Sequence, residues 1–242
     1  MSEERILKMS GHRMASGNVA SRSSYPAETE NKGIMSSDQS RHKTFPAHGI
    51  IFFEGDPANN IYEVADGSVM LYKLLPDGRR QVVEILGPGD LFGVPAGEVY
   101  DTSAETLTET LVHMVSRKEA ESSSTIQEHM KTCLVSQVQS LHEHAVLLGR
   151  KSAHERVASF LMRFVPHRGD FACIGPQGTD SDESVVTLHM TRQEIADYLG
   201  LTIETVSRVL SDMKRRKVIT MEKQDRIRIM NVCGLCHLTG KY

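Results

Sequence analysis

Hydrophobic and polar residues follow different patterns along the chain, and the changes in pattern divide it into segments. Residues 1–42 are rich in Ser, Asn, Glu and Lys and show little apolar periodicity, which predicts a disordered or flexible tail. Over residues 43–123, short apolar runs alternate with glycine turns, as in HGIIFFEGD and GSVMLYKLLPDGRRQVVEIL. Regular short strands of this kind predict an antiparallel β-roll. Asp77-Gly78, between two of the runs, is typical of a hairpin turn.

The spacing of apolar residues becomes helical after residue 124. Apolar positions recur at steps of three or four, which predicts one long helix over residues 124–150. A helix of this length between two domains commonly packs against its own copy, so we predict a homodimer; the alternative is a helix that lies only on its own β-roll. The predicted dimer contacts are Ile126, Met130, Leu134, Val138, Leu141 and Leu148.

Residues 151–242 are predicted to form a second domain that carries two short helices joined by a tight turn. Thr191 followed by Glu194 matches a capping box, which starts the first of these helices at the next residue. Gly200 lies where the end of a helix favours a left-handed residue. Residues 218–229 alternate like a β-hairpin. Together these elements predict a winged helix-turn-helix.

The second of the two helices carries a polar face that suits base pairs. Glu204, Ser207 and Arg208 are spaced at i, i+3 and i+4, so they share one side of the helix. Arg makes bidentate contacts with guanine, and Glu accepts a hydrogen bond from the cytosine amino group. Ser207 is small enough to allow close approach. We therefore predict that these three residues read DNA bases in the major groove.

Polar and basic residues around this face suit the phosphates of DNA. A run of four basic residues, 214–217, follows the base-reading face, and residues 189–230 contain nine Lys or Arg against six Asp or Glu. The local net charge is therefore +3, whereas the whole chain carries −3. A solvated basic helix end is the plainer interpretation of the run. The predicted phosphate contacts are Thr191, Arg192, Thr202, Thr205, Lys214 and Arg215.

The composition is that of a protein with packed cores and no membrane segment. The chain has 242 residues, 39% of them hydrophobic, which is enough for two modest domains. No run approaches the ~18 apolar residues of a membrane span, and the N-terminus lacks a secretory apolar core, so we expect a cytoplasmic protein. The chain shows no nucleophile–base set and no phosphate-binding glycine loop. We predict no catalytic residues, no metal site and no cofactor; a small-molecule-binding barrel or an enzyme with an incidental helix-turn-helix is the distant alternative.

Four cysteines do not make a disulfide framework in that compartment. The sequence from Cys233 to His237, CGLCH, matches both a redox pair and the attachment pattern of c-type haem. We interpret this pair as structural, packing a short final helix; a redox or metal pair and a haem site are the alternatives. The candidates for a redox response are Cys173, Cys233 and Cys236.

Three motifs, in this order, resemble the Crp–Fnr family of bacterial transcription regulators. They are GPGDLFG at 87–93, ERVASFL at 155–161 and TRQEIADYLGLTIETVSRVL at 191–210, and the resemblance covers roughly residues 43–238. It implies an α+β fold with a cupin-like β-roll of the cyclic-nucleotide-binding type, a long dimerisation helix and a winged helix-turn-helix. The spacing of Glu204, Ser207 and Arg208 is similar to the FixK branch. That branch implies a homodimeric activator that binds a palindrome with TTGA-type half-sites and contacts RNA polymerase.

Two departures from the family remove its best-known signals. Cyclic-AMP receptors hold the nucleotide phosphate with an Arg-Ser or Arg-Thr pair, but here Thr102 precedes Ser103, and a buried anion without a partner is costly. Cyclic AMP binding is therefore not expected. Residues 1–132 contain no cysteine, which excludes an N-terminal iron–sulfur cluster of the Fnr type. A haem, nitric-oxide or thiol-redox-responsive regulator of the same fold stays open, although His142, His144 and His154 are expected to be exposed or partly packed rather than ligands.

Overall fold

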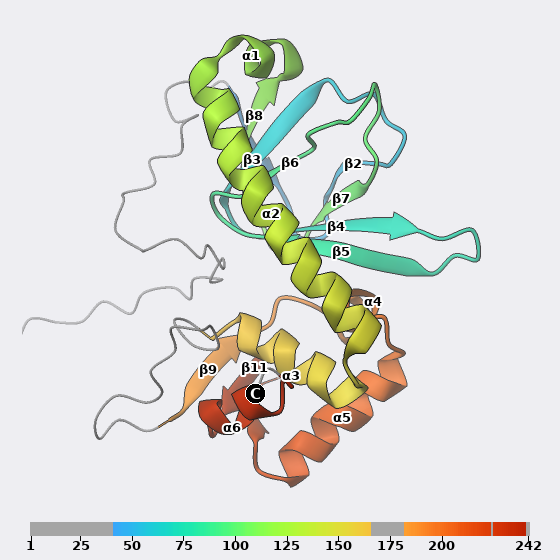
Figure 1. Cartoon of the computed structure of the whole chain (residues 1–242), viewed down its shortest axis with the longest axis vertical. Helices are drawn as coiled ribbons and strands as arrows, with labels where there is room; N and C mark the ends of the chain where they lie inside the picture. The colour runs from blue at the N-terminus through green and yellow to red at the C-terminus, as the bar shows by residue number, and fades with distance from the viewer. Residues whose placement is uncertain (1–40, 166–181, 224, 241–242) are drawn as a thin grey trace, which may run out of the picture.

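The computed structural model describes residues 41–165, 182–223 and 225–240 (Figure 1). A β-rich part and a helix-rich part lie one above the other, and one long helix runs from the first to the second (Figure 1). The predicted N-terminal tail lies almost entirely outside the described residues. None of the helices in the described part of the chain is both long and apolar enough to cross a bilayer.

The β-rich part is the predicted antiparallel roll, made of two four-stranded sheets. The first sheet has the order β1 (His42–Phe45), β8 (Thr110–Ser116), β3 (Asn60–Asp66) and β6 (Leu91–Phe92). The second has the order β2 (Ile50–Phe52), β7 (Ser103–Thr106), β4 (Val69–Leu74) and β5 (Arg80–Leu86). Aromatic rings fill the space between the sheets: the ring of Phe52 stacks 3.8 Å from that of Tyr100, and Tyr62 stacks 5.2 Å from Phe92. The predicted hairpin is present between β4 and β5, where Gly78 has a φ of +83°.

The long helix α2 (Ser124–Arg150) follows a short helix, α1 (Arg117–Ser122), and has the predicted bounds. Its two ends pack within the chain, and of the six predicted dimer contacts only Ile126 is buried there. Ile126, only 8% exposed, lies in a core with residues of the roll, and Met130 packs against that core. Leu148 packs against the core of the helix-rich part. Periodicity located the apolar side of the helix but did not show that its ends are covered by the same chain.

The helix-rich part has the order expected of a winged helix-turn-helix. Its elements are α3 (Ala153–Arg163), β9 (Ser184–Thr187), α4 (Arg192–Leu199), α5 (Ile203–Arg215), β10 (Ile219–Met221), β11 (Arg226–Ile229) and α6 (Val232–His237). The three strands form one antiparallel sheet in the order β10-β11-β9. Thr191 and Glu194 form the predicted capping box, and Gly200 ends α4 in the left-handed conformation with a φ of +59°. The local signals for this motif are therefore confirmed.

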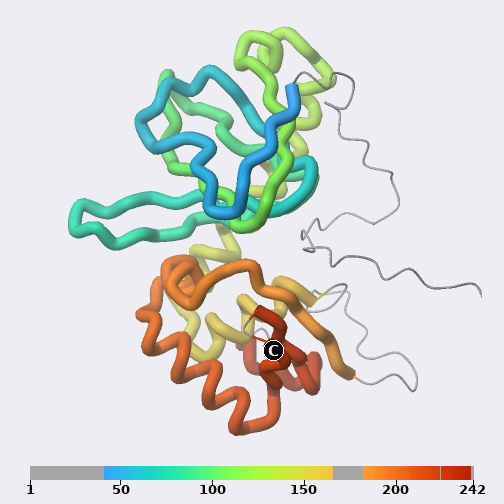
Figure 2. The backbone as a smooth tube through the Cα atoms, turned by 180° about the vertical axis from the view of Figure 1, so that it is seen from behind, coloured from blue at the N-terminus to red at the C-terminus, as the bar shows by residue number. Residues whose placement is uncertain are grey.

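The two parts touch each other along β5, α2, α3 and α4 (Figures 1 and 2). Arg80 of β5 forms an ion pair with Asp197 of α4, with Nε 2.9 Å from the carboxylate. Arg163 of α3 donates a hydrogen bond of 3.0 Å to the carbonyl oxygen of Ile85. We call the contacts between the roll and the helix-rich part, which include those of Arg80, His144 and Arg163, the interdomain contact. It fixes where the helix-turn-helix lies relative to the roll.

Candidate DNA interface

The second helix of the motif, α5, has one buried side and one exposed side. Its buried stripe packs in the core and consists of Val206, Val209, Leu210 and Met213. Glu204, Ser207 and Arg208 are exposed on the other side of the helix, as their spacing predicts. The structure therefore brings the three predicted base-reading residues together on a face that DNA can approach.

The start of α5 is ordered by local hydrogen bonds. The hydroxyl of Thr202 accepts the backbone N–H of Thr205 at 3.2 Å, which caps the helix. The pKa of Glu204 is lowered first by its own backbone N–H, then by the Thr202 hydroxyl, and also by the charge of Arg208. Glu204 is therefore held as an acceptor at a helix start, next to the guanidinium of Arg208. One face thus offers a carboxylate and a guanidinium side by side.

Some of the predicted phosphate contacts already interact with other residues of the chain, and others do not. Lys214 is exposed and forms no ion pair with the residues that the structure describes. The hydroxyls of Thr191 and Thr202 already cap helices, and that of Thr205 lies 3.1 Å from the Thr202 hydroxyl. Arg192 is half-buried, its pKa is lowered by burial, and its guanidinium lies 4.0 Å from the sulfur of Met221. Among the predicted phosphate contacts, Lys214 would therefore lose the fewest interactions within the protein on binding DNA.

Asp212 pairs with basic residues at the end of α5, a role that was not predicted from the sequence. Its carboxylate pairs with Arg215, lies 3.7 Å from the guanidinium of Arg216, and lies 3.4 Å from the ring of His154. The hydrogen bond from Arg215 is the largest cause of the lowered pKa of Asp212. The signal was present in the sequence, because Asp212 precedes Arg215 and Arg216 by three and four residues. Arg215 must therefore loosen this pair to reach a phosphate.

The two terminal cysteines lie on the predicted short final helix. Cys233 and Cys236 are half-buried on α6, which Asn231 caps, and Cys236 packs against the surrounding core. Cys173 lies outside the described residues. Cys133 has no role predicted from the sequence, yet its sulfur lies 3.7 Å from the ring of His129, four residues earlier on α2. Contact with this thiol, followed by contact with the buried Glu63, raises the pKa of His129 to about 10.

His144 was expected to be exposed or partly packed, and that prediction is wrong. The residue is 7% exposed, and its ring stacks 4.3 Å from that of Tyr198. Its Nδ1 lies 3.0 Å from the carbonyl oxygen of Val83, and its Nε2 lies 2.8 Å from that of Tyr198. Burial lowers the pKa of His144. The histidine thus connects α2 with the roll on one side and with α4 on the other.

Two family models match this chain, one for each part. A model of the Crp-like helix-turn-helix domain matches residues 155–238. A model of the cyclic nucleotide-binding domain matches residues 42–122. Along the chain, the roll matches the second model and the helix-rich part that follows it matches the first.

Among curated proteins, the chain is similar to nitrogen fixation regulators. It is 38% identical to the nitrogen fixation regulation protein FixK of Rhizobium meliloti over 180 residues, which cover 74% of this chain and 78% of the relative. It is 37% identical to the FixK protein of Azorhizobium caulinodans over 198 residues, which cover 80% and 77%. Among solved structures, FixK2 from Bradyrhizobium japonicum aligns with a TM-score of 0.68 at 33% identity, over 81% of this chain and 96% of that one.

Proposed function

The chain belongs to the Crp–Fnr family of transcription regulators, and from this premise we propose that it binds, as a homodimer, a DNA palindrome with TTGA-type half-sites. It is a helix-turn-helix DNA-binding regulator of the FixK type. The observation that carries the proposal is the exposed face of Glu204, Ser207 and Arg208, backed by the buried stripe of α5. Activation through RNA polymerase, in the cytoplasm, is part of the same proposal.

The chemistry of this face fits the single G·C pair of a TTGA half-site. The guanidinium of Arg208 can donate two hydrogen bonds to guanine, and the carboxylate of Glu204 can accept one from the paired cytosine. The two side chains lie one helical turn apart on the same face, so both can reach neighbouring base edges. Ser207 lies between them and leaves room for the backbone to approach. The face therefore fits the G·C pair of such a half-site.

The middle of α2 supports the proposed dimer. Leu134, Val135, Val138 and Leu141 are all exposed apolar residues in the central turns of this helix. An apolar stripe of this kind on a long helix indicates a protein contact, and a second copy of α2 would cover it. Two-fold symmetry would then place the two recognition helices about one DNA turn, ~34 Å, apart. Because Ile126 is buried within the chain, the proposed dimer contact is centred on Leu134, Val138 and Leu141.

DNA binding is tested by fluorescence anisotropy with two labelled duplexes at fixed salt. One duplex carries the TTGA palindrome, and the other has the G·C pair of each half-site reversed. We expect tight binding to the first duplex only, and loss of that preference in Arg208→Ala. Arg79→Ala is the matched control, because Arg79 is exposed on the β4–β5 turn of the roll and lies outside the helix-turn-helix. Equal binding to both duplexes by the unmodified protein would contradict the proposal.

The dimer is tested by sedimentation of two variants with matched exposure. Val138 on α2 and Val99 on the roll are each 48% exposed. Val138→Glu should give a monomer with weak binding to the palindrome, because a carboxylate would be buried in the contact. Val99→Glu should remain dimeric. A dimer that survives Val138→Glu would show that the two copies meet elsewhere.

A second candidate function, a thiol-redox-responsive regulator of the same fold, is favoured by the contact between Cys133 and His129. A protonated imidazole next to a thiol stabilises the thiolate, which is the reactive form of cysteine. DNA binding measured with and without reductant tests this candidate. A redox effect that disappears in Cys133→Ser supports it, and identical affinities in both conditions contradict it.

A further inference from the structure

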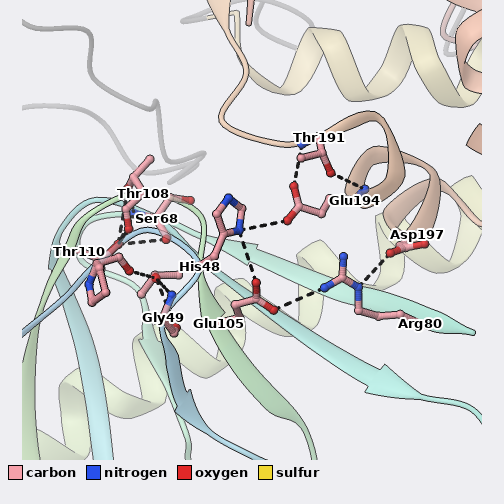
Figure 3. A network of polar contacts seen from close by, with 12 residues as sticks. His48, Gly49, Ser68, Arg80, Glu105, Thr108, Thr110, Thr191, Glu194 and Asp197 are labelled. Atoms are coloured by element: carbon pink, nitrogen blue, oxygen red, sulfur yellow. Dashed lines mark hydrogen bonds and ion pairs between the residues drawn. The ribbon is translucent and has the colours of Figure 1, made fainter. Parts of the chain in front are cut away.

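One group of polar side chains joins the roll to the first helix of the helix-turn-helix (Figure 3). His48 lies in the turn between β1 and β2, Glu105 lies in β7, and Glu194 lies in the first turn of α4. Figure 3 shows the ring of His48 pointing between the two carboxylates. One nitrogen or oxygen atom from each residue lies within 4.8 Å of the others. Residues far apart in the sequence therefore present three metal-ligand atoms to one point.

The two distances at His48 suit an ion better than direct hydrogen bonds. Nδ1 of His48 lies 3.4 Å from Oε1 of Glu105 and 3.5 Å from Oε1 of Glu194. N–H···O hydrogen bonds are commonly about 2.7–3.2 Å long. Ligand bonds of about 2.0–2.2 Å around a tetrahedral ion would place neighbouring ligand atoms ~3.3–3.6 Å apart. Both separations at His48 fall in that interval.

Each carboxylate is oriented through its other oxygen. Oε2 of Glu194 accepts the backbone N–H of Thr191 at 2.6 Å, the capping-box bond of α4. Oε2 of Glu105 lies 3.4 Å from the guanidinium of Arg80, which also holds Asp197. Glu194 is only 4% exposed, so its carboxylate has little freedom to turn away. The hydrogen bond to the outer oxygen of Glu194 and the nearby cation at that of Glu105 are the kind of support that holds metal-ligating carboxylates in place.

The charges around the group leave an excess that a dication would balance. Glu105, Glu194 and Asp197 are negative, and Arg80 is positive, so two negative charges remain while His48 is neutral. Metal binding requires that neutral form of histidine. The side chain of His48 is half-exposed, which leaves a path for an ion and room for water as a fourth ligand.

From these observations we propose that His48, Glu105 and Glu194 bind one divalent transition-metal ion of the Zn²⁺ type. An imidazole with two carboxylates is a donor set for borderline ions of this class. The sequence predicts no metal site, because its three ligands are separated by long stretches of chain and match no spacing motif. The ion would tie β7 and the β1–β2 turn to the first turn of α4.

Such an ion would bind only when the roll and α4 lie against each other. It would therefore favour the arrangement in which they touch over any arrangement that separates them. If the protein binds DNA as proposed above, DNA and metal must change each other's affinity by the same factor. This consequence rests on the proposed function, whereas metal binding itself does not.

The test uses the full-length reduced protein and Co²⁺ as a spectroscopic probe, without DNA. We expect one Co²⁺ per chain, ligand-field bands without thiolate charge transfer, and displacement by Zn²⁺. Two variants should weaken Co²⁺ binding at least as much as the ~10–100-fold typical of lost outer contacts. His48→Asn keeps a residue that tolerates the left-handed backbone at this position, where φ is +58°. Glu194→Gln keeps an acceptor for the capping box.

His154→Asn is the matched control, since His154 is a half-exposed histidine whose ring lies 3.4 Å from a single carboxylate, that of Asp212. It should bind Co²⁺ like the unmodified protein. Two results would overturn the proposal: no Co²⁺ bound at all, or Co²⁺ bound with thiolate charge transfer that persists in both site variants. A failure of DNA binding would leave these measurements unaffected. The coupling is then measured as the change in Co²⁺ affinity on adding duplex, which His48→Asn should abolish.

Discussion

The exposed face of α5 and the interdomain contact are built in opposite ways. On α5, Glu204, Ser207 and Arg208 are exposed, and the hydrogen bonds that hold Glu204 come from the first turn of the helix and its cap. In the interdomain contact, side chains meet partners from distant parts of the chain; Arg80 and Asp197 are 117 positions apart. The first region can therefore change with little effect on the fold, whereas the second cannot. DNA reading and domain coupling should be separable by mutation.

The largest effect is expected at the centre of the interdomain contact. His144→Ala removes a buried ring that stacks on Tyr198 and deprives two carbonyl oxygens of their nearby nitrogens. We expect the free energy of unfolding to fall by about 2–4 kcal/mol, from the cavity and the lost polar contacts. Urea denaturation measures it. His142→Ala, two residues earlier and exposed, is the control and should change stability by less than about 0.5 kcal/mol. Equal losses of unfolding free energy in the two variants would show that the buried contacts of His144 contribute nothing special to stability.

The next effect tests the opposite side of the comparison. Glu204→Ala removes an exposed carboxylate that accepts no hydrogen bond from another part of the fold in the described residues. Discrimination at one base pair of each half-site should weaken by about 1–3 kcal/mol. The free energy of unfolding should change little, because the hydrogen bonds that lower the pKa of Glu204 lie within the exposed first turn of α5 and its cap. Competition between duplexes that differ only at that pair measures the first quantity, and urea denaturation measures the second. A loss of stability as large as that of His144→Ala would show that the face also supports the fold.

A smaller effect should depend on pH. Burial, followed by the charge of Asp90, raises the pKa of Glu84 from 4.5 to about 7, and Arg163 opposes the shift. Because the folded pKa lies above the unfolded one, the contribution to stability is complete below pH 4.5 and is lost as the pH rises through 7. Glu84→Gln keeps a neutral side chain at every pH.

Glu84→Gln should therefore match the unmodified protein near pH 5 and be more stable near pH 8 by on the order of 1–2 kcal/mol. Urea denaturation at the two pH values measures this difference. Glu98→Gln is the control, because the Glu98 side chain is 95% exposed. A Glu84 variant that loses stability at pH 8 would mean that the ionised carboxylate is stabilising in the interdomain contact.

What could be predicted from the sequence follows the same division. The capping box of Thr191 and Glu194 and the turn at Gly200 depend on residues within a few positions, so their spacing is sufficient to predict them. The exposed face of α5 follows from helical periodicity. Periodicity also placed Ile126 and Leu134 on one stripe of α2, but it does not say what covers each residue. In the structure the roll covers the first and leaves the second exposed.

The interdomain contact could not be predicted because no local rule relates its members. His144 meets Val83 and Tyr198, which lie 61 and 54 positions away, and an isolated histidine on a helix gives no sign of such partners. The group of His48, Glu105 and Glu194 is a similar case. Only the packing of the roll on α4 brings these side chains together. The contact between the roll and the helix-rich part is thus the part of the structure that a single sequence conceals.

The smallest effect is expected at the basic end of α5, where two neighbouring residues differ in how free they are. Lys214 is exposed, whereas Arg215 pairs with Asp212. Lys214→Ala should weaken binding to all duplexes alike, by about 1 kcal/mol or less per contact. The slope of log affinity against log salt should flatten by about 0.9 per lost phosphate contact, or ~1.8 for a dimer. Arg215→Ala should flatten it less, because its charge is already partly neutralised within the chain. A salt titration with specific and scrambled duplexes measures both, and a sequence-selective loss in Lys214→Ala would place Lys214 among the base-reading residues instead.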